Sequence, residues 1–191
     1  SEPKVLTKKA LGPDYIENFK EPEKPLRLFH GTTRDFEGFD PDAEMHYFSA
    51  DPTDVDYYAG INYRSDFPDY MEGGKIIPVY LKDANYFDVD NPEHLKILEQ
   101  SDFYKKDPDS VNLDDVESGQ YMELEGIAPE LKKLGFDGHT TYEGTGKNFA
   151  VYDTDLIVSG IEKKADGGEA RTSGIGTLHM TARNMFRPMV S

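Results

Sequence analysis

Two tyrosines and a His-Gly pair are spaced along the sequence as residues that could hold a flat ring. His30 and Gly31 end a short run of strand-like residues, where a glycine main chain lets a planar ligand approach closely. Tyr47 ends a second such run, and Tyr58 follows eleven positions later in a segment with helical spacing. Together with the close approach that Gly31 allows, these positions indicate a candidate site for a flat ligand.

A third segment with candidate residues lies about ninety positions further on. Asn148 follows a glycine-rich loop and opens a strand-like run that ends at Asp153, and Glu143 lies in the loop just before it. Taken singly, these features have ordinary structural explanations, because a histidine before a glycine is most often a turn residue and a tyrosine-rich helix most often packs in a core. The case for a site therefore rests on the three segments together.

Short runs of apolar residues, bounded by turn residues, must position these side chains. Strand-like composition occurs at residues 26–30, 45–49, 75–81, 136–141, 149–152 and 156–161. Helical spacing occurs at residues 51–59, 91–98 and 119–134. Residues 103–121 resemble a polar insertion and carry no motif that we can identify. Short strands with a few interposed helices indicate an α+β domain.

The chain has 191 residues, which is enough for one well-buried core, and we place this core at residues 26–160. Residues 1–25 contain four prolines and are expected to form an extended N-terminal arm with at most a short helix. Residues 161–191 form a glycine-rich, mildly basic C-terminal tail with five basic and three acidic residues. This tail is either an ordered extension of the domain or a segment that binds a partner.

Charge and composition exclude several classes of function. The chain has 37 acidic and 21 basic residues and a net charge of -16, so we expect no nucleic-acid binding and a basic protein as partner. The absence of cysteine excludes a disulfide framework and thiolate catalysis, and the five histidines lack the spacing of a metal site, so no metal is expected. Without an eighteen-residue apolar run or a visible secretory signal, we expect no membrane association and a cytoplasmic location.

Two acidic or glycine-rich segments are similar to ligand-binding loops but lack a required residue. Residues 144–148 end like a phosphate-binding loop, yet Thr141 stands where a glycine is needed. Residues 88–91 begin like a calcium-binding loop, yet Glu93 stands at the position of the sharp turn, which needs glycine. Neither segment therefore predicts a phosphate or calcium site.

In this order, the three candidate segments resemble the NAD-binding core of the ADP-ribosyltransferases, in the His-Tyr-Glu branch that includes diphtheria toxin and the poly(ADP-ribose) polymerases. That branch has His-Gly-Thr on its first core strand, Tyr-Phe-Ser or Tyr-Phe-Ala before a helix with a second tyrosine, and a late strand that begins with glutamate. The matching segments are residues 30–32, residues 47–49 with Tyr58, and residues 148–153. The resemblance covers residues 26–160 and implies a split β-sheet core with a few short helices. Residues 134–153 also look like small transferase domains of bacteriophage and mobile-element proteins, which implies a toxin or effector that acts in a bacterial host cell.

The resemblance implies NAD as the substrate and assigns a role to each matching residue. His30 would hydrogen-bond the adenosine-side ribose, and the Gly31 main chain would hold the nicotinamide carboxamide. Tyr47 and Tyr58 would stack on the two sides of the nicotinamide ring. The implied catalytic residues are His30, Tyr47 and Asn148, and the implied NAD-binding residues are His30, Gly31, Thr32, Tyr47, Ser49 and Tyr58.

Asn148 is a departure from the family pattern, because it stands where that branch has its catalytic glutamate. A neutral amide can hold a ribose hydroxyl but brings no charge, so we expect a slower reaction. Because the glutamate lets the family extend chains, the resemblance implies transfer of a single ADP-ribose to a protein side chain. The alternatives are a degenerate module that binds NAD or ADP-ribose, an NAD glycohydrolase, and a structural domain without activity. Glu143 either supplies charge or positions an acceptor, or it is a solvated loop carboxylate.

Overall fold

The computed structural model describes residues 3–32, 36, 38–59, 74–144 and 146–159. Its centre is a seven-stranded sheet with the strand order β4-β5-β6-β2-β1-β3-β7. The strands are β1 (Leu28–Thr32), β2 (His46–Ser49), β3 (Lys75–Leu81), β4 (Tyr86–Phe87), β5 (Gly138–Glu143), β6 (Gly146–Val151) and β7 (Ile157–Ser159). The helices are α1 (Pro13–Ile16), α2 (Asp56–Ala59), α3 (Pro92–Glu99), α4 (Asp102–Lys106), α5 (Leu113–Glu117) and α6 (Tyr121–Lys133), with 3-10 turns η1 (Lys8–Leu11), η3 (Pro108–Ser110) and η4 (Thr154–Leu156).

The sheet is mixed, because β4 pairs with β5 in parallel while the other strand pairs among the described residues are antiparallel. Strand β1 pairs with β3 along its whole length, from Leu28 to Thr32, whereas its register with β2 is a single pair, Phe29 with Ser49. The α+β class and the split sheet that the sequence predicts are therefore confirmed, with the split between β1 and β2.

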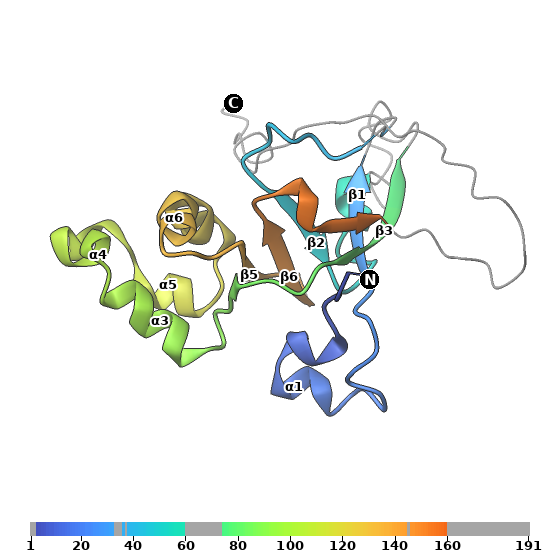
Figure 1. Ribbon diagram of the computed structural model, residues 1–191, viewed down its shortest axis with the longest axis horizontal. Coiled ribbons are helices and arrows are strands. Elements are labelled where there is room, and N and C mark those ends of the chain that lie inside the picture. Colours follow the sequence, from blue (N-terminus) through green and yellow to red (C-terminus); the bar gives the residue numbers. More distant parts are fainter. Residues whose placement is uncertain (1–2, 33–35, 37, 60–73, 145, 160–191) are drawn as a thin grey trace, which may run out of the picture.

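Two apolar clusters hold the fold together. The first packs against the sheet and includes Leu28, Phe48 and Phe149 from three of the central strands. The second lies among helices α3 to α6 and includes Phe87, Leu124 and Phe136. Figure 1 shows these four helices as one group beside β5 and β6, on the left of the view. Among the described residues, no helix is long and apolar enough to cross a membrane.

The N-terminal segment packs on the sheet, whereas the sequence analysis expects an extended arm there. Leu6 and Leu11 are buried in the first apolar cluster. The main-chain N–H of Leu6 donates to the Leu81 carbonyl at 2.8 Å, and that of Leu26 donates to the Leu6 carbonyl at 2.8 Å. The prolines still exclude a long helix, but two well-spaced leucines suffice to anchor this segment. The expected C-terminal tail lies outside the described residues.

Residues 103–121, expected as a polar insertion, contain two short helices. Ser101 caps α4 by accepting a hydrogen bond from the Tyr104 N–H at 3.1 Å, and Asn112 caps α5 by accepting one from the Asp114 N–H at 3.2 Å. Buried Val116 then joins α5 to the second apolar cluster. Polar side chains cover the outside of these helices, which explains why the segment is hydrophilic overall.

Candidate active site

Side-chain alternation along β2, β5 and β6 brings one set of candidate residues to the same face of the sheet. Tyr47 pairs with Ala150, which pairs with His139, and Ser49 pairs with Asn148, which pairs with Thr141. Cross-strand partners point to the same side of a sheet. Tyr47, His139, Glu143 and Asn148 therefore share one face, and we call this set, together with Tyr58 of α2, the tyrosine face.

Helix α2 reaches the tyrosine face because Gly31 has no side chain. A Cβ atom at Gly31 would lie 2.4 Å from the Val55 carbonyl oxygen and 3.0 Å from the Ala59 nitrogen. Any larger residue would therefore push the helix, and Tyr58 with it, away from the sheet. The resemblance implies a ligand-binding role for Gly31, and the structure shows that helix packing alone already requires glycine there.

The main chain of Gly31 points toward the divergence between β1 and β2. Phe29 lies opposite Pro78, which has no N–H, so this is a non-hydrogen-bonded pair and Phe29 directs its main-chain groups toward β2. Gly31, two residues further along, directs its own groups the same way. Beyond the pair of Phe29 with Ser49 the register of the two strands is not continued in the described residues, which leaves the Gly31 amide at the edge of the split.

His30 ties the two strands together where they separate. Its Nδ1 lies 3.0 Å from the Tyr47 carbonyl oxygen, and because a carbonyl only accepts, Nδ1 carries the proton and Nε2 is left as an acceptor. The ring packs against Phe36, Phe39 and Phe48. Because Phe29 pairs with Ser49 of the tyrosine face, the His30 side chain lies on the other side of the sheet, and the structure does not bring it to the face of Tyr47 and Asn148. Burial lowers the pKa of His30 to about 4, so the imidazole is neutral near pH 7.

Three buried polar atoms of the tyrosine face have no hydrogen-bond partner in the structure. They are the Tyr47 hydroxyl, Nε2 of His139 and Oδ1 of Asn148. Asn148 is only 6% exposed, and its Nδ2 donates to the Glu143 carbonyl at 3.3 Å, which turns Oδ1 toward the tyrosine face. Buried polar atoms are almost always satisfied, so three unsatisfied atoms on one face indicate a place where a ligand supplies the missing partners.

Two carboxylates and two further tyrosines surround Tyr47. Burial, followed by the charge of Glu125 and then by Tyr152 and Glu143, raises the pKa of Tyr47, so its hydroxyl stays protonated and remains a donor. The Tyr58 hydroxyl donates to Oε1 of Glu143. Glu143 thus bonds to Tyr58 of the helix, and its charge also acts on Tyr47 of the strand.

Sequence reasoning missed Tyr121, Glu125 and His139 as members of this environment. Tyr121 and Glu125 lie four positions apart on α6, so they share one face of that helix. This spacing is visible in the sequence, but nothing in it shows that the helix turns that face toward Tyr47. His139 is one of five histidines and was weighed only as a metal ligand.

The two remaining predicted NAD-binding residues, Ser49 and Thr32, lie on opposite sides of the sheet. Ser49 is on the tyrosine face, and its hydroxyl donates to Asp54 at 3.3 Å and accepts from the Asp51 N–H at 3.1 Å. Thr32 is buried at the end of β1 and pairs with Lys75 of β3. The described residues contain no group of acidic residues and histidines arranged to hold a metal ion.

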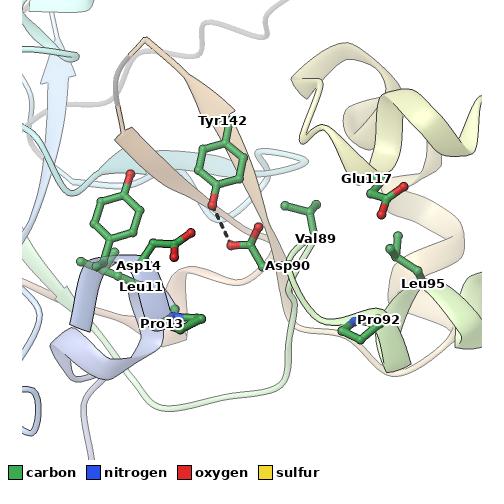
Figure 2. Close-up of a pocket in the computed structure, with 11 residues that line it drawn as sticks. Leu11, Pro13, Asp14, Val89, Asp90, Pro92, Leu95, Glu117 and Tyr142 are labelled. Carbon is green, nitrogen blue, oxygen red and sulfur yellow. Dashed lines mark hydrogen bonds between the residues drawn. The ribbon is translucent and has the colours of Figure 1, made fainter. Parts of the chain in front are cut away.

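The opposite face of the same strands carries a different arrangement, which we call the lysine face. Nζ of Lys147 lies 2.6 Å from Asp88 and 2.7 Å from Asp90, and the Tyr142 hydroxyl donates to Asp90 at 2.7 Å. Beside Asp90 and Tyr142 is a cavity of about 350 Å³ that lies between α1 and α3 (Figure 2). The aspartates of the calcium-like segment therefore serve as counter-ions for a buried lysine.

Comparison with known proteins agrees with the resemblance that the three segments show. Residues 22–166 match the model of a family described as ADP-ribosyltransferase in polyvalent proteins, which is well over half of the chain. No curated protein and no solved structure matches the sequence. The match includes every strand of the sheet and every residue of the tyrosine face. The chain therefore belongs to this family of ADP-ribosyltransferases.

Proposed function

We propose that the protein cleaves the nicotinamide–ribose bond of NAD and transfers one ADP-ribose group to a protein side chain. The observation that carries this proposal is the tyrosine face, where three buried polar atoms lack partners beside two tyrosines from different elements. NAD has ribose hydroxyls that can hydrogen-bond to the buried polar atoms. It also has a planar cationic ring on which the two tyrosines can stack. Family membership supports the transfer chemistry in general.

The resemblance suggests a role for each group, and the contacts of that group support it. Tyr47 and Tyr58 stack on the nicotinamide ring, which is cationic in NAD, and each such contact contributes about 0.5–2 kcal/mol. The Gly31 main chain, which points toward the divergence of β1 and β2, binds the carboxamide. Nε2 of His30 accepts from a ribose hydroxyl, because Nδ1 already donates to Tyr47. Ser49 shares the face of Asn148 and borders the site, whereas the resemblance alone supports a role for Thr32.

Bond cleavage leaves positive charge on the ribose. The bond from C1′ to the pyridinium nitrogen breaks, its electron pair leaves with neutral nicotinamide, and C1′ develops oxocarbenium character, as in glycoside chemistry. Oδ1 of Asn148, which is buried and unpartnered, accepts a hydrogen bond from the 2′-hydroxyl and holds the sugar in place. The acceptor side chain then attacks C1′ with a lone pair and loses a proton.

The net charge of -16 favours a basic protein as the acceptor over nucleic acid, since a phosphate backbone would be repelled. A neutral residue at position 148 favours a single transfer over chain growth. Labelling of oligonucleotides in preference to proteins would contradict the first statement, and a ladder of long products would contradict the second.

The test uses the full chain, NAD labelled in the adenosine part and a bacterial lysate. We expect release of nicotinamide and labelling of protein bands, with both signals reduced at least tenfold by Tyr58→Ala and by His30→Gln. His94→Gln is the matched control, because His94 lies on α3, where its Nδ1 accepts from the Asp88 N–H. A wild-type protein that releases no nicotinamide and labels nothing would refute the transferase proposal.

A second candidate is a module that binds NAD without turning it over, and Asn148 is the observation that favours it. Calorimetry separates the two candidates: NAD binding without nicotinamide release identifies the binding module. Nicotinamide release without any labelled product, with free ADP-ribose formed in equal amount, identifies a glycohydrolase.

A further inference from the structure

Glu143 lies where a negative charge would act on the ribose. We propose that the Glu143 carboxylate supplies the charge that stabilises the ribosyl cation, in place of the carboxylate that position 148 lacks. This inference rests on the proposed NAD cleavage and adds a catalytic residue to it. It also gives Asn148 a narrower role, which is to hold the sugar and not to stabilise its charge.

Glu143 lies at the end of a strand on the same hairpin as Asn148. It is the last residue of β5, and its partner across the hairpin is Gly146 of β6. Thr141 is two residues earlier on β5 and pairs with Asn148, so alternation places the side chains of Glu143 and Asn148 on the same face. The Nδ2 group of Asn148 donates to the Glu143 carbonyl at 3.3 Å, which links the two residues directly.

A hydrogen bond fixes the Glu143 carboxylate. The Tyr58 hydroxyl donates to Oε1 of Glu143 across 85 positions of sequence, so the carboxylate is attached to the helix that carries one of the two stacking rings. A carboxylate has further lone pairs, and Oε2 has no role in this bond. Glu143 is only partly exposed. A solvated loop carboxylate, the other reading of this residue, would have neither the hydrogen bond nor the burial.

Glu125 and Glu143 are the two carboxylates whose charge acts on Tyr47. Both charges contribute to the raised pKa of Tyr47 and of Tyr121, with burial as the main cause in each case. Glu125 projects from α6, whereas Glu143 belongs to the same hairpin as Asn148 and bonds to Tyr58. Glu143 is thus the carboxylate that the structure connects both to the residue proposed to hold the ribose and to a ring proposed to hold nicotinamide.

The proposed chemistry requires no proton transfer to or from Glu143. When the C1′–N bond breaks, the electron pair leaves with nicotinamide and the positive charge spreads over C1′ and the ring oxygen of the ribose. An ionised carboxylate in a partly dry site stabilises that developing charge more than it stabilises the ground state, since the reacting sugar is neutral before the bond breaks.

The experiment measures nicotinamide release and NAD affinity for three variants of the full chain. Glu143→Gln should lower kcat about 100-fold and leave the Kd for NAD within about threefold of the wild type. Tyr58→Phe keeps the ring and removes only the hydroxyl that fixes Glu143, so it should lower kcat about tenfold. The double variant Glu143→Gln with Asn148→Glu returns a carboxylate to the site, so its kcat should be at least tenfold higher than that of Glu143→Gln alone.

Glu99→Gln is the matched control, because it makes the same change of charge at an exposed position of α3 and should leave kcat within twofold. If wild-type protein releases nicotinamide and Glu143→Gln does so at a rate within threefold, the charge role is refuted while NAD cleavage stands. If wild-type protein releases none, both proposals fall. If Glu143→Gln does not fold, Tyr58→Phe decides, and an unchanged kcat in that folded variant refutes the inference.

Discussion

Lys147 and Asn148 are neighbours on β6 that point to opposite faces of the sheet, and they differ in how their polar groups are satisfied. The Lys147 side chain is 0% exposed, and its ammonium group contacts two aspartates. Asn148 is 6% exposed, and its Oδ1 has no partner. Both residues are polar and both are buried in a strand core, so the difference lies in what each face provides for them.

The comparison separates a face whose polar groups are paired from the face that we propose binds NAD. On the lysine face, Lys147 bonds to Asp88 and Asp90, and Tyr142 donates to Asp90. On the tyrosine face, Tyr47, His139 and Asn148 each keep an unpartnered buried atom. Such atoms ordinarily destabilise a fold by about 1–3 kcal/mol each. Three on one face are consistent with the proposed binding of NAD, which would supply their partners.

The largest effect is expected from breaking the lysine face. Lys147→Met removes one member of a buried charged cluster and leaves Asp88 and Asp90 facing each other, which should reduce the free energy of unfolding by about 3–5 kcal/mol. Urea denaturation measures this change. The control Lys96→Met removes an exposed ion pair with Glu93 and should change stability by less than about 1 kcal/mol.

Activity provides the second half of that test. At a temperature where Lys147→Met is folded, nicotinamide release per folded molecule should stay within about threefold of the wild type, since Lys147 points away from the tyrosine face. A loss of a hundredfold in the folded variant would show that the two faces are not separate, and the comparison would fail.

The next effect concerns Asn148. Asn148→Ala removes the proposed acceptor for the ribose hydroxyl and should lower kcat for nicotinamide release by about 10- to 100-fold, which is about 1.4–2.7 kcal/mol of transition-state stabilisation. Stability should change by less than about 1 kcal/mol, because one weak donor bond is lost together with one unsatisfied oxygen. Asn18→Ala, at an exposed position on the N-terminal segment, should change neither quantity.

The pH dependence of stability reports on the buried histidine of the tyrosine face. Burial lowers the pKa of His139 to about 3, whereas an unfolded histidine titrates near 6.5. Between these values the unfolded chain binds a proton that the native protein does not, so stability falls as the pH is lowered through this window. From pH 6.5 to pH 5 the contribution of this group is about 2 kcal/mol.

Replacement of His139 isolates that contribution. His139→Gln cannot titrate and still offers an acceptor to the Tyr152 hydroxyl, which lies 2.7 Å from Nδ1 in the wild type. Unfolding free energies at pH 7, 6 and 5 should therefore fall less steeply in the variant. Parallel curves for the two proteins would mean that His139 is protonated or exposed in the folded state.

The strands of the central sheet could be predicted from the sequence, whereas several helices could not. Residues 75–81 and 136–141 are predicted as strands because β-branched and aromatic residues lie between turn residues. Both segments contain strands in the structure, although β5 begins and ends two positions later than predicted. Strand β4 has two residues and leaves no periodic signal. The helices α4 and α5 are too short for clear spacing, although their caps, Ser101 and Asn112, were visible signals.

The site could be predicted only in part, because a sequence gives the types of residue and not the direction of a helix face. Tyr47, Tyr58 and Asn148 could be named from their order, and the structure brings them to one face. Glu125 and Tyr121 could not, since their place depends on how α6 packs. The sequence also cannot show why a glycine is needed at position 31. Close approach of a ligand and close packing of helix α2 would both require it.

The smallest effects come from a pair of matched tyrosine substitutions, one on each face. Tyr47→Phe removes a buried hydroxyl that has no partner, so the free energy of unfolding should rise by up to about 1 kcal/mol. Tyr142→Phe removes a hydroxyl that donates to Asp90 at 2.7 Å, so stability should fall by about 1–2 kcal/mol. Loss of the hydroxyl is thus expected to raise stability at position 47 and lower it at position 142, as measured by urea denaturation of both variants at pH 7.

Saturating NAD should reduce the gain in stability that Tyr47→Phe gives over the wild type, because in the wild type the ligand would then satisfy the hydroxyl. Two losses of equal size in the absence of NAD would mean that the Tyr47 hydroxyl already has a partner, such as an ordered water, and that the faces differ less than their side-chain contacts indicate.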